Sequence, residues 1–429
     1  MGRVTPRLLD VSQAPRPGAG LSCRAMDHDL IIIGAGPAGL SLARALRGSG
    51  LRLALIEQSA QASLASPTFD GREIALTQRS AEHLRQLGIW PLLGDAHIAP
   101  LRDALVLDGH TRPQQPSMTI SHTLGARPEL GFLVANQHIR RAAFQAAMAP
   151  LDASGAPPEL RCDSNVSGVR SDAHGATVTL ASGEQLQARL VVAADSRHSL
   201  TRRAMGIPAD LHDYGRTMLV CNMTHEEPHH ATAWEWFDHG QTLALLPMNP
   251  CPVSGLPRSS VVLTLAHHAV QAMLELPDDA FNTNMTQRFG QRLGPMHLSS
   301  TRHAYPLVGV WAQRFVAQRF AVVGDAAVGM HPVTAHGFNL GLRSVDTLAQ
   351  LLRQAHQRGQ DIASPELLQR YQTRHRLTSR GLYLATHALA TLYTREDGPS
   401  RWLRRTMLGA GERFTPFKRA VAASLTGLH

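Results

Sequence analysis

Residues 29 to 57 carry the pattern of a strand, a glycine turn, a helix and a second strand, which constrains the fold more than any other feature. The run Asp29–Ile33 is apolar and largely β-branched, as expected for a parallel strand buried on both faces. Three glycines follow it at the spacing G-x-G-x-x-G: Gly34, Gly36 and Gly39. In such a turn the first glycine permits a tight bend, the second leaves room for a pyrophosphate, and the third lets the helix pack on the strand. The pattern predicts a βαβ unit that binds a dinucleotide.

A second strand and an acidic residue complete this unit. Leu51–Ile56 reads as a buried strand, and Glu57 follows it at about the spacing where a carboxylate takes the ribose hydroxyls of an adenosine. The intervening helix would offer free amides and the positive end of its dipole to the phosphates. An ordinary βα turn, with Glu57 as a solvated strand end, is the alternative. The combination of strand, spacing and acid favours dinucleotide binding.

A second glycine-rich segment, residues 324 to 342, indicates which dinucleotide is bound. Arg319–Val323 reads as another buried strand, and Gly324 and Asp325 follow it. A carboxylate there can accept hydrogen bonds from a ribityl chain, which a nicotinamide dinucleotide lacks. Gly337–Leu351 has apolar residues at helical spacing, and its free N-terminal amides would stabilise the negative charge of a reduced flavin ring. A surface helix is the alternative, but the two segments together predict FAD as the cofactor.

These motifs resemble those of the single-component flavin-dependent aromatic hydroxylases, and specifically their ubiquinone-biosynthesis branch. Four segments fall in the order of that family: Phe69–Leu76, Ser80–Trp90, Gly131–Asn136 and Gly324–Leu342. The resemblance extends from about Met26 to about Tyr393. Within the branch, the sequence Ala335-His336-Gly337 is most similar to the demethoxyubiquinol hydroxylase subgroup.

The resemblance implies an α/β fold with a Rossmann-like FAD-binding domain of the para-hydroxybenzoate hydroxylase type. We expect this domain in two parts, residues 26–200 and 312–360, around an inserted substrate domain, mainly β-sheet, at residues 201–311. Residues 361–429 would form a basic helical C-terminal region, and residues 1–25 a disordered extension. Four segments of the inserted part are strand-like: Met218–Met223, Thr232–Phe237, Leu243–Leu246 and Ser260–Leu265.

The resemblance also assigns roles to single residues. Arg72 stands where the family has an arginine near the adenine and pyrophosphate, although a surface ion pair is the alternative. Asn136 is either near the phosphates or the N-cap of a helix over Gln137–Met148. Pro332 matches a proline beside the reactive flavin edge and is a candidate catalytic-site residue; otherwise it forms a turn. The residues expected to contact FAD are Gly34, Gly36, Gly39, Glu57, Arg72, Asn136, Gly324, Asp325, Gly337, Phe338 and Asn339.

Two positions depart from the family pattern. Ala335 and His336 stand where most relatives have Gly-Gln before Gly337. His336, the second candidate catalytic residue, is either a proton relay or a hydrogen-bonding replacement for glutamine, and we favour the replacement. Ser196 stands where relatives have a glycine with a nicotinamide role. The electron donor therefore stays open between NADPH and another reductant.

The activity that the resemblance implies is hydroxylation of a polyprenylated phenol or quinol ring in ubiquinone biosynthesis. Reduced FAD reacts with molecular oxygen to a C4a-hydroperoxide, and the protein positions the ring and excludes water. Two alternatives remain open: a non-catalytic flavin-fold subunit that binds lipids or scaffolds the ubiquinone-synthesis assembly, and another flavin enzyme acting on lipid alkenes. The 23 histidines show no metal-binding spacing, so we expect no metal.

The net charge of +9 is concentrated near the C-terminus, where residues 370–429 hold 11 Lys or Arg against 3 Asp or Glu. One apolar stripe at helical spacing is expected to pack on the core: Leu368, Tyr371, Leu382, Ala385, Leu389 and Leu392. A second stripe consists of Phe414, Phe417, Val421, Leu425 and Leu428. We hypothesise that residues 402–428 dock peripherally on an anionic membrane or on a ubiquinone-synthesis complex. No nucleic-acid-binding module is recognisable, and we expect no such partner.

Cysteine usage and hydropathy favour a cytoplasmic location with peripheral contact at the inner membrane. The four cysteines have no paired spacing, as is typical of a reducing compartment. Residues 1–25 lack the apolar segment of a signal peptide, and no run approaches the length of a membrane-spanning helix.

Overall fold

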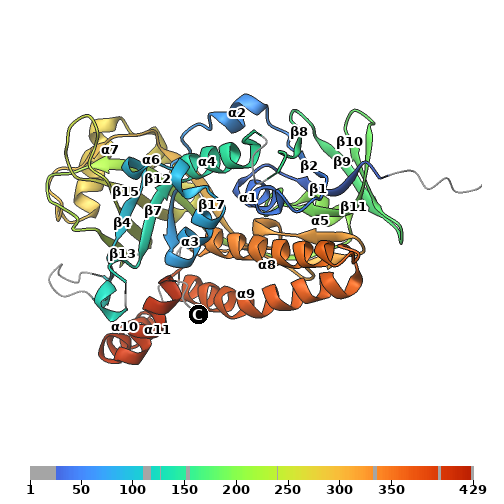
Figure 1. Cartoon of the computed structure of the whole chain (residues 1–429). Coiled ribbons are helices and arrows are strands. Elements are labelled where there is room, and N and C mark those ends of the chain that lie inside the picture. Colours follow the sequence, from blue (N-terminus) through green and yellow to red (C-terminus); the bar gives the residue numbers. More distant parts are fainter. Residues whose placement is uncertain are drawn as a thin grey trace, which may run out of the picture.

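The computed structural model describes residues 26–109, 117–125, 127–150, 155–238, 240–331, 336–394 and 398–426. Two lobes lie side by side above a pair of long helices, α8 and α9 (Figure 1). One lobe is built on a sheet with a parallel centre and the other on a large, mostly antiparallel sheet. The predicted extension at residues 1–25, Pro332 and Ala335 lie outside the described residues.

The first lobe brings the two glycine segments to one sheet edge. Strand β1 (His28–Ile33) runs parallel between β2 (Leu53–Ile56) and β11 (Gln185–Ala193). Strand β19 (Phe320–Val322) is parallel to β11 on its other side, so that Ile33 and Val322 both pair with Ala193. The turns that follow β1 and β19 therefore start at the same level. The remaining strands of this sheet are β8 (Glu159–Arg161), β9 (Val166–Ser171), β10 (Ala176–Leu180) and β18 (Val316–Ala317).

Helices pack on this sheet and fix the turns between them. Helix α1 (Pro37–Leu46) starts with a proline, which is favoured at the first helical position. It packs against α4 (Asn136–Met148) and α8 (Gly337–Gln357), and α8 packs against α9 (Pro365–Thr394). The Tyr371 hydroxyl of α9 donates a 2.7 Å hydrogen bond to the Val322 carbonyl, which ties α9 to the sheet. Short helices α2 (Gln61–Ala65) and α5 (Leu200–Ala204) complete the lobe.

The second lobe contains the four strands predicted from the sequence. These are β12 (Ala209–Thr224), β13 (Thr232–Asp238), β14 (Gln241–Met248) and β15 (Arg258–Ala266). Alternate side chains of the sheet pack on α6 (His267–Glu275) and α7 (Asp278–Arg288) in a separate hydrophobic core. The other strands are β5 (Asp103–Asp108), β6 (Met118–Ser121), β16 (His297–Leu298), β17 (His303–Ala312) and β20 (Val328–Gly329).

The large sheet is assembled from more of the chain than the inserted segment. Strand β13 pairs in parallel with β5, and β5 pairs with β6. Both β5 and β6 precede residue 201, where the sequence analysis began the substrate domain. Sequence patterns within 201–311 could not reveal this pairing, because it joins strands more than 100 residues apart. The boundaries at residues 201 and 311 stay a prediction.

A small three-stranded sheet links the lobes. It consists of β3 (Glu73–Thr77), β7 (Gly131–Ala135) and β4 (Ala99–Leu101). Helix α3 (Gln78–Gln86) follows β3 directly, and the Thr77 hydroxyl caps it by accepting a 3.1 Å hydrogen bond from the Ser80 amide. This cap fixes the angle at which α3 approaches α8.

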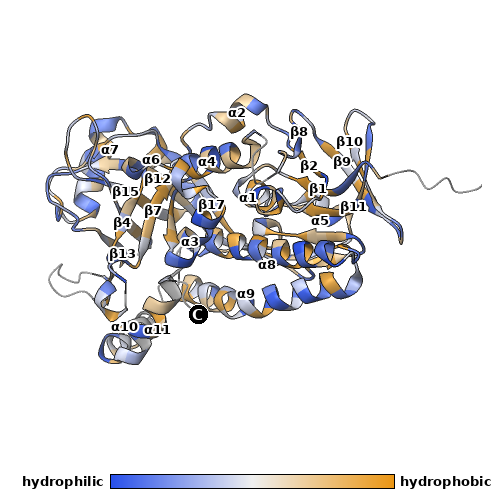
Figure 2. Ribbon diagram, viewed as in Figure 1, coloured by the Kyte–Doolittle hydropathy of each residue, from blue (hydrophilic) through white to orange (hydrophobic). Residues whose placement is uncertain are grey.

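The C-terminal helices divide between core and surface. In the first predicted stripe, Leu368 and Tyr371 are buried and Leu382 packs on the core, but Ala385 is exposed. Hydrophobic positions are spaced along α9 between hydrophilic ones (Figure 2). Within the described residues, no helix combines the length and the apolar character that crossing a bilayer requires.

Helices α10 (Gly398–Arg413) and α11 (Thr415–Thr426) pack partly on the second lobe. Leu408 and Ala422 are buried in a cluster with β6. Of the second predicted stripe, Val421 packs against this cluster, whereas Phe414 is 60% exposed. Part of the apolar surface of the predicted docking segment therefore packs against the second lobe of the protein itself.

Candidate functional site

The first glycine turn is closed on two sides and open on a third. Gly34 has φ of +104°, and a Cβ there would lie 2.6 Å from the Ala194 carbonyl oxygen. A Cβ on Gly39 would lie 1.9 Å from the Gly34 oxygen, so only glycine allows α1 to approach β1. A Cβ on Gly36 would meet nothing within 4 Å. The open side is at the N-terminus of α1, where free amides suit a phosphate.

Glu57 lies against this turn from the neighbouring strand. Its Oε2 accepts a 2.7 Å hydrogen bond from the Ala35 amide, and its Oε1 accepts a 2.9 Å bond from the Ser59 amide. Both oxygens retain acceptor capacity because a carboxylate has about four lone-pair sites. The carboxylate is therefore next to the glycine turn, where the predicted ribose contact requires it.

The second glycine segment meets the first through backbone contacts. Gly324 has φ of +61°, and a Cβ there would lie 3.0 Å from the Ala38 Cβ of α1. A Cβ on Gly341 of α8 would lie 3.3 Å from the Gly324 Cα. The Gly324 amide donates a 3.0 Å hydrogen bond to the Ser344 hydroxyl. Gly324 is thus the point where α1, β19 and α8 converge. We call Gly34–Gly39 together with Gly324 the glycine cradle.

Asp325, the predicted ribityl acceptor, forms an ion pair at the site surface. Its Oδ2 lies 3.2 Å from a guanidinium nitrogen of Arg197, and the two side chains are 41% and 33% exposed. Nearby, Asp195 accepts hydrogen bonds from Ser199 at 2.8 Å and Thr201 at 3.0 Å. The buried Oδ1 of Asp195 has no hydrogen-bond partner among the described residues. Ser196 between them was singled out from the sequence, but neither Asp195 nor Arg197 was predicted as a site residue.

Arg72 forms an ion pair with Asp70 and not with the adjacent Glu73. A guanidinium nitrogen lies 2.6 Å from Asp70 Oδ2, and the guanidinium lies 5.4 Å from the centre of the Tyr305 ring. Burial alone would raise the pKa of Asp70, but the hydrogen bonds and charge of Arg72, with the Asn136 amide, hold it below its ordinary value. Asp70 thus orients Arg72, and its place two residues before Arg72 was the available sequence signal.

Asn136 does not cap a helix, so that alternative was wrong. Helix α4 begins at Asn136 itself, Ala135 occupies the cap position, and no side chain caps it. The Asn136 Nδ2 donates a 2.8 Å hydrogen bond to Asp70 Oδ2 instead. The physical reason is that the partly buried Asp70 carboxylate needs donors. Asn136 therefore joins Arg72 at Asp70, and its predicted phosphate contact stays a prediction.

The start of α8 is fixed to β3 by one side chain. Asn339 Oδ1 accepts a 3.0 Å hydrogen bond from the Thr77 amide, and its Nδ2 donates a 2.8 Å bond to the Ala75 carbonyl. His336 is buried at the cap position of α8, and Phe338 packs on the core of the first lobe. A Cβ on Gly337 would meet nothing within 4 Å. Open space thus adjoins the first α8 amides, as the predicted flavin contact requires.

Burial keeps two carboxylic acids neutral: Glu73, on the small sheet between the lobes, and Glu235, in the large sheet. Burial raises the pKa of Glu73 to about 8, even though Asn222 and Arg258 act in the opposite direction. Burial raises the pKa of Glu235, on β13, to about 8 as well. Neither residue stood out in the sequence, since burial follows from the tertiary structure.

An aromatic and histidine cluster follows β20. Burial lowers the pKa of His331 to about 4, so this imidazole is neutral at neutral pH. The Tyr214 ring contacts it edge-on with ring centres 4.7 Å apart. The Tyr214 hydroxyl is 3.1 Å from Nδ1 of His387 on α9. Tyr214 and His387 were not identified from the sequence.

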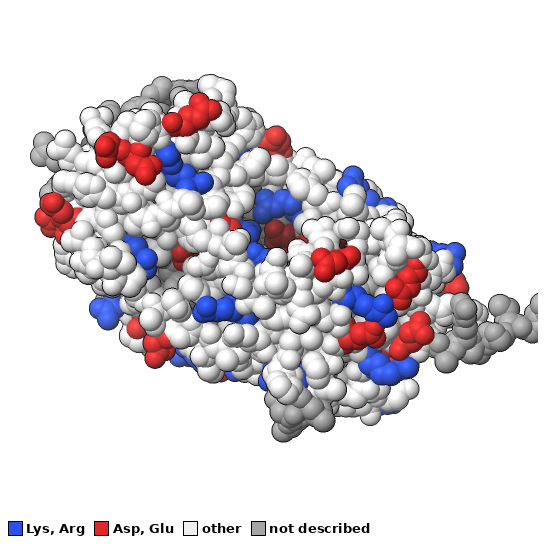
Figure 3. Space-filling view, turned by 90° about the horizontal axis from the view of Figure 1, so that it is seen from above, with Lys and Arg blue, Asp and Glu red and all other residues white. Residues whose placement is uncertain are grey.

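The surface above the two lobes is hollowed near its middle, and both basic and acidic side chains surround the hollow (Figure 3). Among the described residues, no group of three or more His, Cys, Asp or Glu side chains is placed to hold a metal ion. The residues present fit FAD, because the glycine cradle leaves its open side at Gly36 and no atom of the described residues fills the space at Gly337.

Two glycine segments at one sheet edge, with a large sheet beside them, define the class of FAD-dependent monooxygenases. The family model for the FAD-binding domain matches residues 27–383, and the chain belongs to this family. The p-nitrophenol 4-monooxygenase PnpA of Pseudomonas putida is similar in fold, with a TM-score of 0.72 at 18% identity over 93% of this chain and 98% of that chain. The predicted fold class is confirmed.

Relatives in sequence are ubiquinone-pathway hydroxylases. The ubiquinone hydroxylase UbiM of Neisseria meningitidis is 43% identical over 94% of this chain and 85% of its own length. The 3-demethoxyubiquinol 3-hydroxylase of Escherichia coli is 25% identical over 93% of this chain and 98% of its own length. The predicted resemblance to the ubiquinone-biosynthesis hydroxylases is thereby confirmed.

Proposed function

We propose that this protein is an FAD-dependent monooxygenase that hydroxylates the aromatic ring of a polyprenylated phenol or quinol in ubiquinone biosynthesis. The observation that carries the proposal is the meeting of two glycine segments at Gly324, with Glu57 and Asp325 at the two ends of the cradle. The 43% identity to a protein named ubiquinone hydroxylase supports the substrate class.

Each part of FAD has residues suited to hold it. Glu57 would bind the adenosine ribose, the open side of Gly36 the pyrophosphate, and Asp325 the ribityl chain. Arg72 would contact a phosphate, since a guanidinium already oriented by Asp70 loses little freedom on binding. The first amides of α8 would face the ring. When bound, FAD supplies the redox chemistry that activates oxygen.

The chain itself positions the substrate ring and keeps water away. Tyr305 of β17 donates a 2.7 Å hydrogen bond to the Asp70 carbonyl and so joins the large sheet to the cofactor lobe. A fixed joint between the lobes limits the space for a substrate ring and favours one orientation. His336, buried beside the α8 N-terminus, is proposed to act as a hydrogen-bonding replacement for glutamine rather than as a proton relay. Pro332 is proposed to lie at the reactive flavin edge.

The ring carbon that is hydroxylated and the electron donor that reduces FAD are further parts of this proposal. The 43% relative is named a ubiquinone hydroxylase without a ring position, whereas the named 3-hydroxylase is only 25% identical. Demethoxyubiquinol is nevertheless the first substrate to test, because the Ala335-His336-Gly337 sequence is most similar to that subgroup. NADPH and a protein reductant are the two donors to compare.

We further propose peripheral contact of the C-terminal helices with an anionic membrane. Met407 of α10 and Phe414, which directly follows the last residue of that helix, Arg413, are 51% and 60% exposed. Because Leu408 packs on β6, deletion of α10 would disturb the fold, and substitution is the cleaner test. Met407→Ser with Phe414→Ser should weaken vesicle binding, while Val253→Ser with Leu211→Ser, also exposed, should not. Equal binding of the two double variants would rule out this contact.

The activity is tested with FAD-loaded protein, chemically reduced flavin, oxygen and demethoxyubiquinol. A product heavier by one oxygen atom, detected by mass spectrometry, is the expected result. A parallel panel of other prenylated phenols and a prenylated alkene identifies the ring position and the lipid-alkene alternative. If FAD is fully bound and no substrate is oxygenated, the hydroxylase proposal fails in favour of the non-catalytic lipid-binding subunit.

A further inference from the structure

Three buried polar atoms meet where the small sheet approaches the large one. They are Oε1 of Glu73 on β3, Oδ1 of Asn222 on β12 and Oγ of Ser260 on β15. None of the three has a hydrogen-bond partner among the residues that the structure describes. Because a buried polar atom without a partner costs free energy and is rare in a folded protein, three such atoms together indicate that a bound molecule completes them.

The strands bring these three side chains to one place. Asn222 and Ser260 are directly opposite each other in the antiparallel pair of β12 and β15, so their side chains lie on the same face of the large sheet. Glu73 approaches this face from β3, near enough for the Asn222 amide to act on its pKa. Gly71 makes the same approach, since a Cβ there would lie 2.7 Å from Cγ2 of Val220, which shares the face of Asn222.

The face that carries these atoms is turned toward the cofactor lobe. Cys221, the neighbour of Asn222, points the other way, into the separate core with α6 and α7. Alternation along β3 gives the matching result: Ile74 packs on the core of the first lobe, so Glu73 and Ala75 face the large sheet. The three atoms therefore lie at the joint between the lobes and not inside either hydrophobic core.

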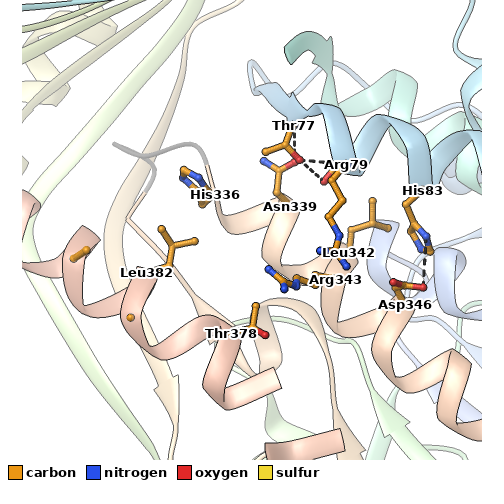
Figure 4. Close-up of a pocket in the computed structure, with 13 residues that line it drawn as sticks. Thr77, Arg79, His83, His336, Asn339, Leu342, Arg343, Asp346, Thr378 and Leu382 are labelled. Carbon is orange, nitrogen blue, oxygen red and sulfur yellow. Dashed lines mark hydrogen bonds and ion pairs between the residues drawn. The ribbon is translucent and has the colours of Figure 1, made fainter. Parts of the chain in front are cut away.

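This joint adjoins the proposed position of the flavin. Ala75, which is two residues or about 7 Å along β3 from Glu73, accepts the hydrogen bond of Asn339 from the first turn of α8. Figure 4 shows Asn339 beside the end of β3. On the other side, Arg72 directly precedes Glu73. Since the first α8 amides are proposed to face the flavin ring and Arg72 a phosphate, a molecule bound at the three atoms would lie beside the cofactor.

The hydrogen-bonding capacity of the three groups matches a hydroxyl. Burial raises the pKa of Glu73 to about 8, and the charge of Asp70 acts in the same direction, whereas Asn222 and Arg258 oppose it. A neutral carboxylic acid can donate a hydrogen bond, a serine hydroxyl can donate or accept, and an amide oxygen only accepts. A quinol hydroxyl has one proton and two lone pairs and can pair with all three. A quinone carbonyl has no proton and would leave the amide oxygen without a partner.

We propose that Glu73, Asn222 and Ser260 bind a ring hydroxyl of the substrate, and that this subsite selects a quinol over the corresponding quinone. The inference rests on the proposed function and deepens it by naming the redox state of the ring. Such selection suits hydroxylation, because an electrophilic oxygen reacts with an electron-rich quinol and not with an electron-poor quinone. An internal water is the competing occupant, and it would make the affinity for substrate independent of these side chains.

The test measures the affinity of the FAD-loaded protein for a short-chain demethoxyubiquinol and for its quinone, from flavin fluorescence without oxygen. The wild type should bind the quinol at least about tenfold more tightly, as a site built around a hydroxyl rejects an analogue that lacks it. Asn222→Leu should lose about tenfold in affinity for the quinol and keep its affinity for the quinone, because only the quinol donates to the amide oxygen.

Ser260→Ala has a matched control in the adjacent residue of β15. Ser259 is also buried, but it lies on the opposite face with its hydroxyl 2.8 Å from Nε2 of His225. Ser260→Ala should weaken quinol binding and leave the unfolding midpoint unchanged, since it removes a hydroxyl without a partner among the described residues. Ser259→Ala should do the reverse, with a lower midpoint and unaltered affinity.

The remaining outcomes separate this subsite from the proposed activity. If Asn222→Leu and Ser260→Ala bind the quinol as tightly as the wild type, an internal water completes the three atoms and the subsite is wrong. Equal affinity of the wild type for quinol and quinone would overturn the selection. A wild type that prefers the quinol through these side chains but inserts no oxygen when reduced would keep the subsite and count against the hydroxylase proposal alone.

Discussion

The glycine cradle and the cavity of about 480 Å³ between α3, α8 and α9, called here the α3–α8–α9 groove, are two hollows built in opposite ways (Figure 4). Backbone atoms define the cradle: a Cβ on Gly39 would overlap the Gly34 oxygen, at 1.9 Å. Side chains from three separate helices define the groove, and a Cβ on its own glycine, Gly381, would meet nothing within 4 Å. A backbone-defined site needs particular residues at fixed spacing and leaves a motif. A side-chain-defined site leaves no motif and emerges only from the folded structure.

The largest expected effect tests whether backbone atoms define the glycine cradle by leaving no room for a side chain. Gly39→Ala puts a methyl group against a backbone oxygen that has no room to move, so we expect destabilisation of more than about 3 kcal/mol and loss of FAD binding. Gly36→Ala is the matched control, because its Cβ meets nothing within 4 Å. It should leave the unfolding free energy of the apoprotein within about 1 kcal/mol but weaken FAD binding at least tenfold. Thermal unfolding and FAD titration separate the two quantities. Unchanged FAD affinity in Gly39→Ala would contradict the cradle.

The next effect concerns a side chain whose properties depend wholly on burial. Glu235 has a pKa of about 8 in the folded protein against an ordinary 4.5. Its protonated form contributes stability that is fully present below pH 4.5 and is lost as the pH rises through 8. Glu235→Gln removes this dependence. The stability of the wild type relative to the variant should fall by roughly 3 kcal/mol between pH 5 and pH 8. Glu73, also raised, is present in both proteins and cancels. A difference that stays constant across this range would show that Glu235 is ionised throughout.

The parts of the fold that the sequence predicted are those with local causes. The apolar run before Gly34 and the helical spacing after Gly337 reappear as β1 and α8. By contrast, the pairing of β5 with β13 and the contact of Asn339 with Thr77 join residues far apart in the chain. Helical periodicity placed Ala385 on the core stripe, yet it is exposed at the groove. Periodicity identifies a face but does not tell which neighbours cover it.

The residues of the candidate site also divide into those with local sequence signals and those defined by contacts between distant parts of the chain. Glu57 could be predicted because its role follows from spacing along a βαβ unit. The place of Asp70 two residues before Arg72 was too weak a signal to single it out, since its importance comes from also holding Asn136, 66 residues further along the chain. The same holds for Arg197, which meets Asp325 across 128 residues. The missed residues are thus those that orient the predicted ones.

A smaller expected loss of stability tests Asn339, which bonds the start of α8 to β3 and lines the α3–α8–α9 groove. Asn339→Ala removes two hydrogen bonds to β3 backbone groups in a buried position, and we expect a loss of about 2 kcal/mol in unfolding free energy. Asn249→Ala is the control, since Asn249 Nδ2 also bonds backbone groups, the Ala96 and Ile98 carbonyls, but in a more exposed place. Its loss should stay below about 1 kcal/mol, because water can replace those bonds. Denaturant unfolding of both variants decides the question, and equal losses would mean that Asn339 does not clamp α8 to β3.

The smallest expected effect concerns Asp325, where cofactor binding and stability should separate. Asp325→Asn weakens an ion pair with Arg197 whose two side chains are 41% and 33% exposed, so stability should change by less than about 1 kcal/mol. FAD affinity should fall about tenfold, since a neutral amide is a weaker acceptor for ribityl hydroxyls than a carboxylate. Asp278→Asn breaks an ion pair with Arg302 of the same 3.2 Å length in the second lobe. That control should match the change in stability and leave FAD affinity unaltered. If both variants bind FAD as tightly as the wild type, Asp325 serves only its ion pair, and the cradle recognises the flavin through backbone groups alone.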